Sequence, residues 1–140
     1  HLEDTFCLTY GDGVSDIDIN QVIALHKKES AEITISAVQP AGRYGSLSIT
    51  GNKVNKFLEK PKGDGQWVNG GFMVCEPSIL KRIKSDETSL EQQPLIDLAE
   101  DNQMAVHKHL GFWAAMDTLR DRKYLESLWA EKEAPWKVWK

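Results

Sequence analysis

The sequence has only two cysteines, no long apolar run and no cluster of basic residues. Cys7 and Cys75 lie in apolar, strand-like runs where buried free thiols are usual, which excludes a disulfide-stabilised secreted domain and favours a cytoplasmic location. No apolar run approaches the roughly 18 residues that span a membrane, so no membrane partner is expected. The net charge is −4 and the basic residues are dispersed, so nucleic acid is not an expected partner and any bound nucleotide is expected to be a small molecule.

The length and composition favour one compact domain. The 140 residues, of which 41% are hydrophobic, suffice for a single core but not for two independent ones. The chain begins at His1, without an initiator methionine, and enters a strand-like run within a few residues. We therefore expect residues 1–140 to be the C-terminal portion of one domain of a longer chain.

Hydrophobic periodicity predicts alternating strands and helices. A strand-like run at 5–10 is followed by helical spacing that starts near Asp18, and then by a second strand-like run at 33–38. A strand, a helix and a strand in that order predict a parallel pair and hence an α/β fold. The later patterns predict a hairpin at 45–58, a strand at 68–75, a short helix at 76–83, a helix at 88–101, a strand at 104–109 and a helix after Thr118.

The stretch from Lys53 to Val74 combines a strand end with a polar loop. Glu59, Lys60 and Lys62 stand where one strand ends, and two glycines open the next strand, where a ligand or a second backbone can approach closely. A lysine supplies a point charge for phosphate, and a carboxylate accepts hydrogen bonds from hydroxyls. The stretch predicts either a phosphate-ester site or, as the alternative, a hairpin whose polar tip carries solvated charge.

Two aspartates are candidate metal ligands. Asp12 follows the first strand between Gly11 and Gly13, at the edge of an α/β sheet where ligands bind. Asp117 precedes Thr118 and a predicted helix. A pair of carboxylates, completed by phosphate oxygens and water, suits Mg²⁺. The alternatives are a structural Asp-Gly turn for Asp12 and a helix N-cap for Asp117.

Two histidines, His107 and His109, alternate with other residues on the strand predicted at 104–109. Histidines at positions i and i+2 share one face of a strand and can bind a metal. No cysteine or third histidine lies close by in the sequence. A polar strand face is therefore the favoured interpretation.

Five ordered motifs resemble those of the sugar-phosphate nucleotidylyltransferases, and the likeness runs over nearly the whole chain. The motifs are TYGDG at 9–13, GRYG at 42–45, FLEKPKGDG at 57–65, VNGGFMV at 68–74 and GFWAAMDTLRD at 111–121. The resemblance implies a Rossmann-like α/β nucleotide-diphospho-sugar transferase fold, with a mixed, mostly parallel sheet and flanking helices. It also implies the transfer of a cytidylyl group from CTP to α-D-glucose 1-phosphate, giving CDP-glucose and pyrophosphate.

The same resemblance implies roles for individual residues. Asp12 and Asp117 are expected to hold Mg²⁺ and Lys60 to meet the sugar phosphate, and these three are the expected catalytic residues. Glu59 is expected to accept hydrogen bonds from sugar hydroxyls. The other residues expected around the substrate are Arg43, Gly45, Lys62, Asn69 and Gly70. The nucleophile is a phosphate oxygen already ionised near neutral pH, so no catalytic base is expected.

The chain departs from the family pattern at its start. Nothing in it corresponds to the family's amino-terminal glycine-rich loop with basic residues, which grips the nucleotide triphosphate. We therefore expect the chain by itself to bind sugar phosphate weakly and not to catalyse the transfer. We also expect a homo-oligomer, because missing leading strands would leave a sheet edge open to pairing. The tryptophan-rich tail at 134–140 is expected to pack on the domain or on a neighbouring subunit.

Three alternatives stay open. The first is a uridylyl- or guanylyltransferase that acts on a hexose 1-phosphate. The second is a non-catalytic module that binds sugar nucleotides, which a large separation of Asp12 from Asp117 would favour. The third is a structural oligomerisation domain built on the tail, which leaves Glu59, Lys60 and the paired glycines unexplained.

Overall fold

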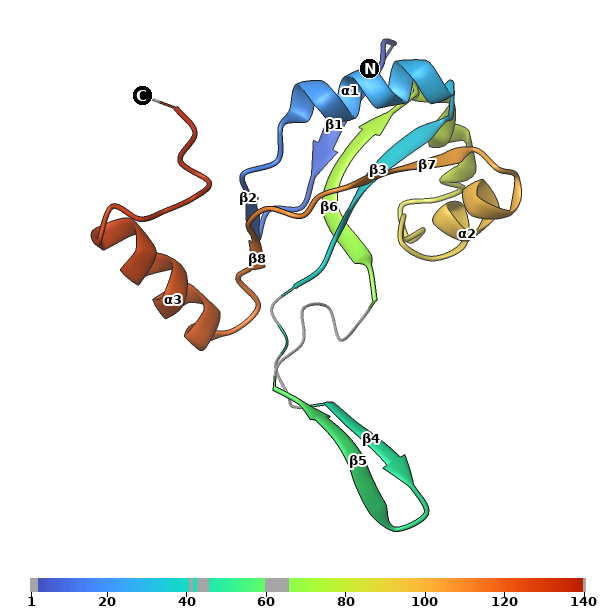
Figure 1. The fold of residues 1–140 in the computed structure, drawn as a ribbon. Helices are drawn as coiled ribbons and strands as arrows, with labels where there is room; N and C mark the ends of the chain where they lie inside the picture. Colours follow the sequence, from blue (N-terminus) through green and yellow to red (C-terminus); the bar gives the residue numbers. More distant parts are fainter. Residues whose placement is uncertain (1–2, 41, 43–45, 60–65, 140) are drawn as a thin grey trace. The chain divides into compact units, whose positions relative to one another are not determined.

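The structure is a computed structural model that describes residues 3–40, 42, 46–59 and 66–139. Two compact units make up the chain: the first comprises residues 1–11, 18–36 and 69–108, and the second comprises residues 12–17, 37–68 and 109–140. No helix in these described ranges is long and apolar enough to cross a membrane. Figure 1 shows the elements in chain order, which are β1 (Phe6–Thr9), β2 (Gly13–Ser15), α1 (Ile19–Glu29), β3 (Ile33–Val38), β4 (Ser46–Thr50), β5 (Lys53–Leu58), β6 (Val68–Cys75), η2 (Pro77–Arg82), α2 (Gln93–Glu100), β7 (Met104–Lys108), β8 (Trp113–Ala115) and α3 (Leu119–Ala130).

The first unit is built on a four-stranded sheet with the strand order β1-β6-β3-β7. β1 pairs with β6 in the antiparallel sense. The amide of Glu76, at the end of β6, donates to the carbonyl of Glu32 just before β3, so β6 and β3 are also antiparallel. The amide of Ile33 donates to the carbonyl of Gln103 just before β7, so β3 and β7 start together and run parallel. The sheet is therefore mixed, as predicted.

The predicted pairing of the first strand with the strand at 33–38 is wrong, because β6 lies between β1 and β3. The two strands do run in the same direction, since each is antiparallel to β6. A crossover helix fixes the direction of the strands that it joins but not whether they are neighbours. A strand from later in the chain occupies the place between them.

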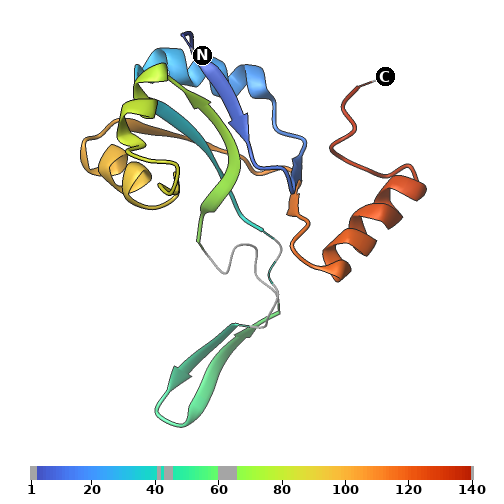
Figure 2. The same cartoon turned by 180° about the vertical axis from the view of Figure 1, so that it is seen from behind.

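Helices cover both faces of this sheet. Side chains alternate along β3, and His26 of α1 hydrogen-bonds Thr34 at 2.9 Å, so α1 covers the face to which Thr34 points. Ile33 points to the other face, where it packs in the core cluster with Ile79 of η2 and Leu98 of α2. Figures 1 and 2 show α1 and α2 on opposite sides of the strands. The first unit thus has the helix, sheet and helix layers of an α/β fold.

Local residues decide where the helices start. Asp18 caps α1 by accepting a hydrogen bond from the amide of Asn20 at 3.0 Å, so this helix begins where predicted. α2 begins at Gln93, and the predicted helix at 88–101 was too long at its amino end. The reason is Pro94, which lacks an amide hydrogen and clashes with the carbonyl four residues back, so it is tolerated only in a first turn.

The two cysteines have different surroundings. Cys75 is buried, and burial raises the pKa of its thiol to about 12. Cys7 is exposed, contrary to expectation, because it lies on the edge strand β1 and points away from the core cluster. Phe6 is the residue opposite Cys75, so the two thiols point to opposite faces of the sheet and do not meet.

An ion-pair network joins three segments of the first unit. Arg82 of η2 donates to Glu32 Oε1 and to Asp101 Oδ2, both at 2.7 Å, and Ser78 donates to Glu32 Oε2 at 2.7 Å. Glu32 precedes β3 and Asp101 follows α2, so the network ties η2 to both. The hydrogen bond from Arg82 is the main cause of a lowered pKa for the Glu32 carboxyl.

In the second unit, the hairpin of β4 and β5 forms as predicted, with Gly51 in its turn at φ 59°. Leu47 lies opposite Phe57 and Ile49 lies opposite Val54, so these four apolar side chains share one face. All four are more than half exposed. Within the described part of the chain, the hairpin is therefore held by its turn and its cross-strand pairs rather than by a buried core.

The tryptophan-rich tail packs on its own unit. The ring of Trp136 stacks on Phe112 with centroids 5.4 Å apart. The ring centroids of Trp139 and Trp129 of α3 are 6.4 Å apart. The Nζ atom of Lys137 lies 5.9 Å from the centroid of the Trp129 ring. The first of the two expected positions for the tail, on the domain itself, is confirmed.

A comparison of stability across pH tests the Arg82 network. A carboxyl whose pKa is lowered in the folded state stabilises the fold above its ordinary pKa, and this contribution is lost as pH falls through the lowered value. We therefore expect Glu32→Gln to be less stable than the wild type near neutral pH, with a difference that shrinks as pH falls below the ordinary glutamate value of about 4.3. Urea denaturation at several pH values measures this difference in the free energy of unfolding. Glu100→Gln, at an exposed position of α2, is the matched control, and a pH-independent loss for Glu32→Gln would contradict the interpretation.

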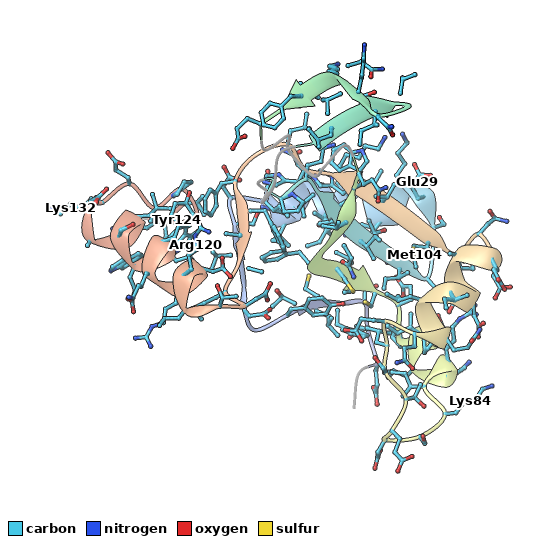
Figure 3. All side chains as sticks on the ribbon, turned by 90° about the horizontal axis from the view of Figure 1, so that it is seen from below. Glu29, Lys84, Met104, Arg120, Tyr124 and Lys132 are labelled. Atoms are coloured by element: carbon cyan, nitrogen blue, oxygen red, sulfur yellow. The ribbon has the colours of Figure 1, made fainter. Side chains whose placement is uncertain are left out.

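The core cluster of the first unit is tested at Leu98. This side chain is 0% exposed, and Met104, labelled in Figure 3 at the start of β7, packs against the same cluster. Leu98→Ala should lower the free energy of unfolding by about 2–5 kcal/mol, because it removes buried methyl groups and leaves a cavity. Ile96→Ala changes a residue of the same helix that is 49% exposed, and should cost less than about 1 kcal/mol. Equal losses in urea denaturation would mean that α2 does not pack on the sheet through Leu98.

Candidate functional site

The ribbon of β2 and β8 carries both candidate metal ligands at the same end. Gly13 lies opposite Ala115 in its antiparallel register. Beyond this pair, the amide of Met116 donates to the carbonyl of Asp12 at 2.9 Å, and Asp117 is the next residue. The pairing of β2 with β8 thus brings to one end of the ribbon two aspartates that lie far apart in the sequence.

Asp117 is not the cap of the helix that follows it. The N-cap of α3 is Thr118, whose hydroxyl accepts a hydrogen bond from the amide of Asp121 at 3.2 Å. The carboxylate of Asp121 in turn accepts from the amide of Thr118 at 3.0 Å, which completes a capping box. The alternative interpretation of Asp117 as an N-cap is therefore wrong.

The two aspartates suit a divalent cation that keeps other ligands. Both residues are exposed. The described residues contain no group of three or more histidine, cysteine, aspartate or glutamate side chains that could hold a metal ion. Mg²⁺ is commonly bound by one or two carboxylates, with substrate phosphates and water in the remaining positions. The residues present therefore fit an ion that is bound together with a phosphorylated ligand.

Asn69 and the paired glycines lie where β6 begins, in the first unit. Asn69 donates from Nδ2 to the hydroxyl of Tyr10 at 3.1 Å and accepts at Oδ1 from the amide of Gly71 at 2.9 Å. The amide of Tyr10 donates to the carbonyl of Gly71 at 3.1 Å. Gly71 has φ 78°, and a Cβ atom there would lie 2.6 Å from Tyr10 Cδ2. Close packing against Tyr10 thus accounts for one glycine of the pair, and Gly70 beside it is buried.

Tyr10 is hydrogen-bonded to Glu91 as well as to Asn69. The carboxylate of Glu91 accepts a hydrogen bond from Ser89 at 2.7 Å and another from Tyr10. These bonds, that of Ser89 first, lower the pKa of the Glu91 carboxyl. Tyr10 was not singled out in the sequence; the available signal was an aromatic ring directly before the Gly11–Asp12 turn.

The other candidate residues are not part of the pairing of β2 with β8. Glu59 follows β5 and is exposed, in the second unit, while Asn69 and Gly70 belong to the first. Arg43, Gly45, Lys60 and Lys62 lie outside the described residues. Among the predicted residues that the structure describes in the second unit, Asp12 and Asp117 are the two that strand pairing brings to one place.

Comparisons with known proteins agree on one kind of chemistry. A family model described as "Nucleotidyl transferase" matches residues 2–129. A glucose-1-phosphate cytidylyltransferase from Salmonella typhimurium is 48% identical over 137 residues, which is 98% of this chain and 53% of that protein. A "probable mannose-1-phosphate guanylyltransferase 1" from Oryza sativa subsp. japonica is 33% identical over 145 residues, covering 96% of this chain and 40% of that protein. The chain thus spans about half the length of these relatives, or less.

A solved structure shares the fold. It is a Bacillus anthracis protein assigned as a glucose-1-phosphate thymidylyltransferase, with a TM-score of 0.64 and 14% sequence identity, covering 90% of this chain and 55% of that one. At this identity the likeness shows the fold alone. The predicted α/β nucleotidyltransferase fold is confirmed.

The close approach of Tyr10 to Gly71 is tested by Gly71→Ala. The added methyl group requires left-handed backbone and meets the Tyr10 ring, so we expect a loss of about 2–4 kcal/mol in the free energy of unfolding. Gly11→Ala is the matched control, because a Cβ atom there has nothing within 4 Å, and it should change stability by less than about 1 kcal/mol. Urea denaturation of both variants decides, and a Gly71→Ala protein as stable as Gly11→Ala would refute the contact.

Proposed function

Because the chain belongs to the nucleotidyl transferase family, we propose that the protein carrying it transfers a cytidylyl group from CTP to α-D-glucose 1-phosphate. The products are CDP-glucose and pyrophosphate. The 48% identity to the Salmonella cytidylyltransferase, over 98% of this chain, supports the choice of substrates. The structural observation that carries the proposal is the register of β2 against β8, which sets Asp12 and Asp117 at one end of the ribbon.

Asp12 and Asp117 are the proposed ligands of Mg²⁺, which when bound neutralises phosphate charge as pyrophosphate leaves. Asp12 directly precedes β2 and Asp117 follows β8, so the pairing of the two strands limits the distance between their Cα atoms before any ligand arrives. Both are exposed, so phosphate oxygens can approach them. In this proposal the two carboxylates hold and orient the reacting phosphates, and neither exchanges a proton.

Lys60 and Glu59 are proposed to hold glucose 1-phosphate. The ammonium group of Lys60 is a point charge for the sugar phosphate, and the exposed carboxylate of Glu59 accepts hydrogen bonds from sugar hydroxyls. Five further residues are proposed around the substrate: Arg43, Gly45, Lys62, Asn69 and Gly70. The amide of Asn69 is held by Tyr10 and Gly71, so it is oriented before a ligand binds.

The reaction needs alignment rather than a catalytic base. An ionised phosphate oxygen of glucose 1-phosphate attacks the α-phosphorus of CTP, the bond from that phosphorus to the bridging oxygen breaks, and pyrophosphate leaves with the electron pair. No proton has to be removed from the nucleophile near neutral pH. Residues that hold the two anions in line against their mutual repulsion therefore supply the catalysis.

The proposed partners of the protein are CTP and glucose 1-phosphate as small molecules, together with further copies of the same chain. The proposed location is the cytoplasm. Both cysteines are free thiols, which is usual in a reducing compartment.

A guanylyl- or uridylyltransferase that acts on a hexose 1-phosphate is the second candidate. The 33% identity to the rice guanylyltransferase favours it. Asp12, Asp117 and Lys60 would have the same roles, because they act on phosphates and not on the base. Initial rates with CTP, GTP and UTP, each with glucose 1-phosphate and mannose 1-phosphate, distinguish the candidates.

Activity of the longest natural chain that contains this sequence tests the proposal. With CTP, glucose 1-phosphate and Mg²⁺ it should release pyrophosphate and form CDP-glucose. Asp12→Asn, Asp117→Asn and Lys60→Ala should each lower kcat/KM by about 100-fold or more, since each removes a group that stabilises phosphate charge in the transition state. Asp86→Asn, an exposed aspartate of the first unit, is the matched control and should leave kcat/KM unchanged.

The outcomes separate the candidates. Transfer with GTP or UTP in preference to CTP would move the assignment to the second candidate. If no nucleoside triphosphate reacts with either sugar phosphate, the enzymatic proposal fails and a sugar-nucleotide-binding module is left. The 140 residues alone should form no CDP-glucose.

A further inference from the structure

At the end of the β2–β8 ribbon away from the two aspartates, side chains form hydrogen bonds between the two segments. Asp16 Oδ1 accepts hydrogen bonds from the amide of Phe112 at 2.7 Å and from His109 Nε2 at 2.8 Å. His109 Nε2 also lies 3.2 Å from the carbonyl oxygen of Phe112. Both neighbours of this nitrogen are acceptors, so Nε2 carries the hydrogen. One carboxylate and one imidazole thus bind the segment before β8 to the end of β2.

Backbone groups strengthen the same junction. The carbonyl oxygen of Phe112 accepts from the amide of Asp16 at 3.3 Å and from the hydroxyl of Ser15 at 2.6 Å. The Ser15 hydroxyl accepts in turn from the amide of Ile17 at 3.2 Å. His109 is itself anchored, since its amide donates to the carbonyl of Ala37 at 2.9 Å. His109 is therefore fixed by a hydrogen bond from its backbone amide as well as by those of its ring.

Gly111 shows how closely the chain passes this pair. A Cβ atom at Gly111 would lie 2.5 Å from Asp16 Oδ1 and 2.7 Å from His109 Cε1. The side chain of His109 is 13% exposed and that of Asp16 is 33% exposed. A close contact between partly buried, charge-assisted partners is stronger than an exposed ion pair. The sequence GFW at 111–113 thus places a glycine where only a glycine fits.

The ribbon needs such a junction to keep its register. Each strand has only three residues, and an isolated two-stranded ribbon of this length is marginal in water. A slip by one residue would reverse the face of every side chain on β8 and move Asp117 away from Asp12. The side chains of Ser15, Asp16 and His109 make the hydrogen bonds of this junction, in part to the backbone of Phe112. The junction lies at the end of the ribbon away from the two aspartates.

We propose that Asp16 and His109 are positioning residues, which fix the register of β2 against β8 and thereby hold Asp12 and Asp117 as a metal-binding pair. This inference rests on the proposed function and deepens it, because nothing else assigns a role to either residue. The two residues touch neither substrate nor metal; they act through the ribbon. Their loss should weaken metal binding more than it weakens the fold, because the first-unit sheet and the capping box of α3 do not depend on them.

The experiment measures Mn²⁺ binding by electron paramagnetic resonance in the longest natural chain that contains this sequence, beside thermal unfolding by circular dichroism. Asp117→Asn first identifies the Mn²⁺ signal that belongs to the pair. At that site, His109→Ala and Asp16→Ala should raise the Kd for Mn²⁺ by about 10-fold or more, as loss of a group that orients metal ligands typically does. His109→Gln, whose side-chain amide can still donate to Asp16, should recover most of the affinity. His107→Ala, on β7, is the matched control and should bind Mn²⁺ as the wild type does.

Kinetics give a second readout in the same proteins. The Mg²⁺ concentration for half-maximal rate should rise in His109→Ala, while KM for glucose 1-phosphate stays within about twofold and saturating metal restores most of kcat. A general loss of folded protein would instead lower the rate at every metal concentration and would not be recovered by His109→Gln.

The outcomes distinguish this inference from the proposed function. A folded His109→Ala protein with unchanged Mn²⁺ affinity overturns the positioning role, while cytidylyl transfer by the wild type leaves the function standing. A wild type that binds no Mn²⁺ at Asp12 and Asp117 and transfers no nucleotidyl group overturns both. If His109→Ala does not fold, Asp16→Ala is measured instead, because it removes the acceptor for both Phe112 and His109, and unchanged Mn²⁺ affinity there also overturns the role.

Discussion

The pairing of β2 with β8 is the interaction on which the candidate site depends. It joins segments near the two ends of the chain, as the hydrogen bond from Ser15 to Phe112 shows. Bringing such distant segments together costs chain entropy, and three pairs of residues offset little of it. The side-chain hydrogen bonds at one end of the ribbon therefore add to the stability of the short strands. Asp12 and Asp117 lie at the same end of the ribbon only because this pairing holds.

Much of the fold could be predicted from local patterns. The Asp18 cap and the alternation at 33–38 are local signals, and the structure follows them. The position of β6 between β1 and β3 could not be predicted, because it depends on which strand best covers the edge of another, and no short pattern records that choice. The start of α2 was predictable in principle, since Pro94 alone limits how many residues can precede it in the helix.

The candidate site divides in the same way. Asp12 could be singled out because it follows an apolar, strand-like run, and ligands gather at that edge of α/β sheets. His109 could not, because its partner Asp16 is distant in the sequence and its neighbour His107 suggested an ordinary polar strand face. The paired glycines predict close approach by a ligand or a second backbone, and in the structure Gly71 lies close to the side chain of Tyr10. A glycine reports close approach but does not identify what approaches.

The start of α3 gives the strongest local argument for a function at Asp117. An aspartate before a helix is most simply explained as a cap, and that explanation would leave the family motif without chemical meaning. Here the capping requirement is met by Thr118 and Asp121, whose side chains satisfy each other's amides. Helix stability therefore gives no reason for a carboxylate at the preceding position. A carboxylate that does not cap the helix, at a position that strand pairing sets close to a second aspartate, fits the metal pair proposed above.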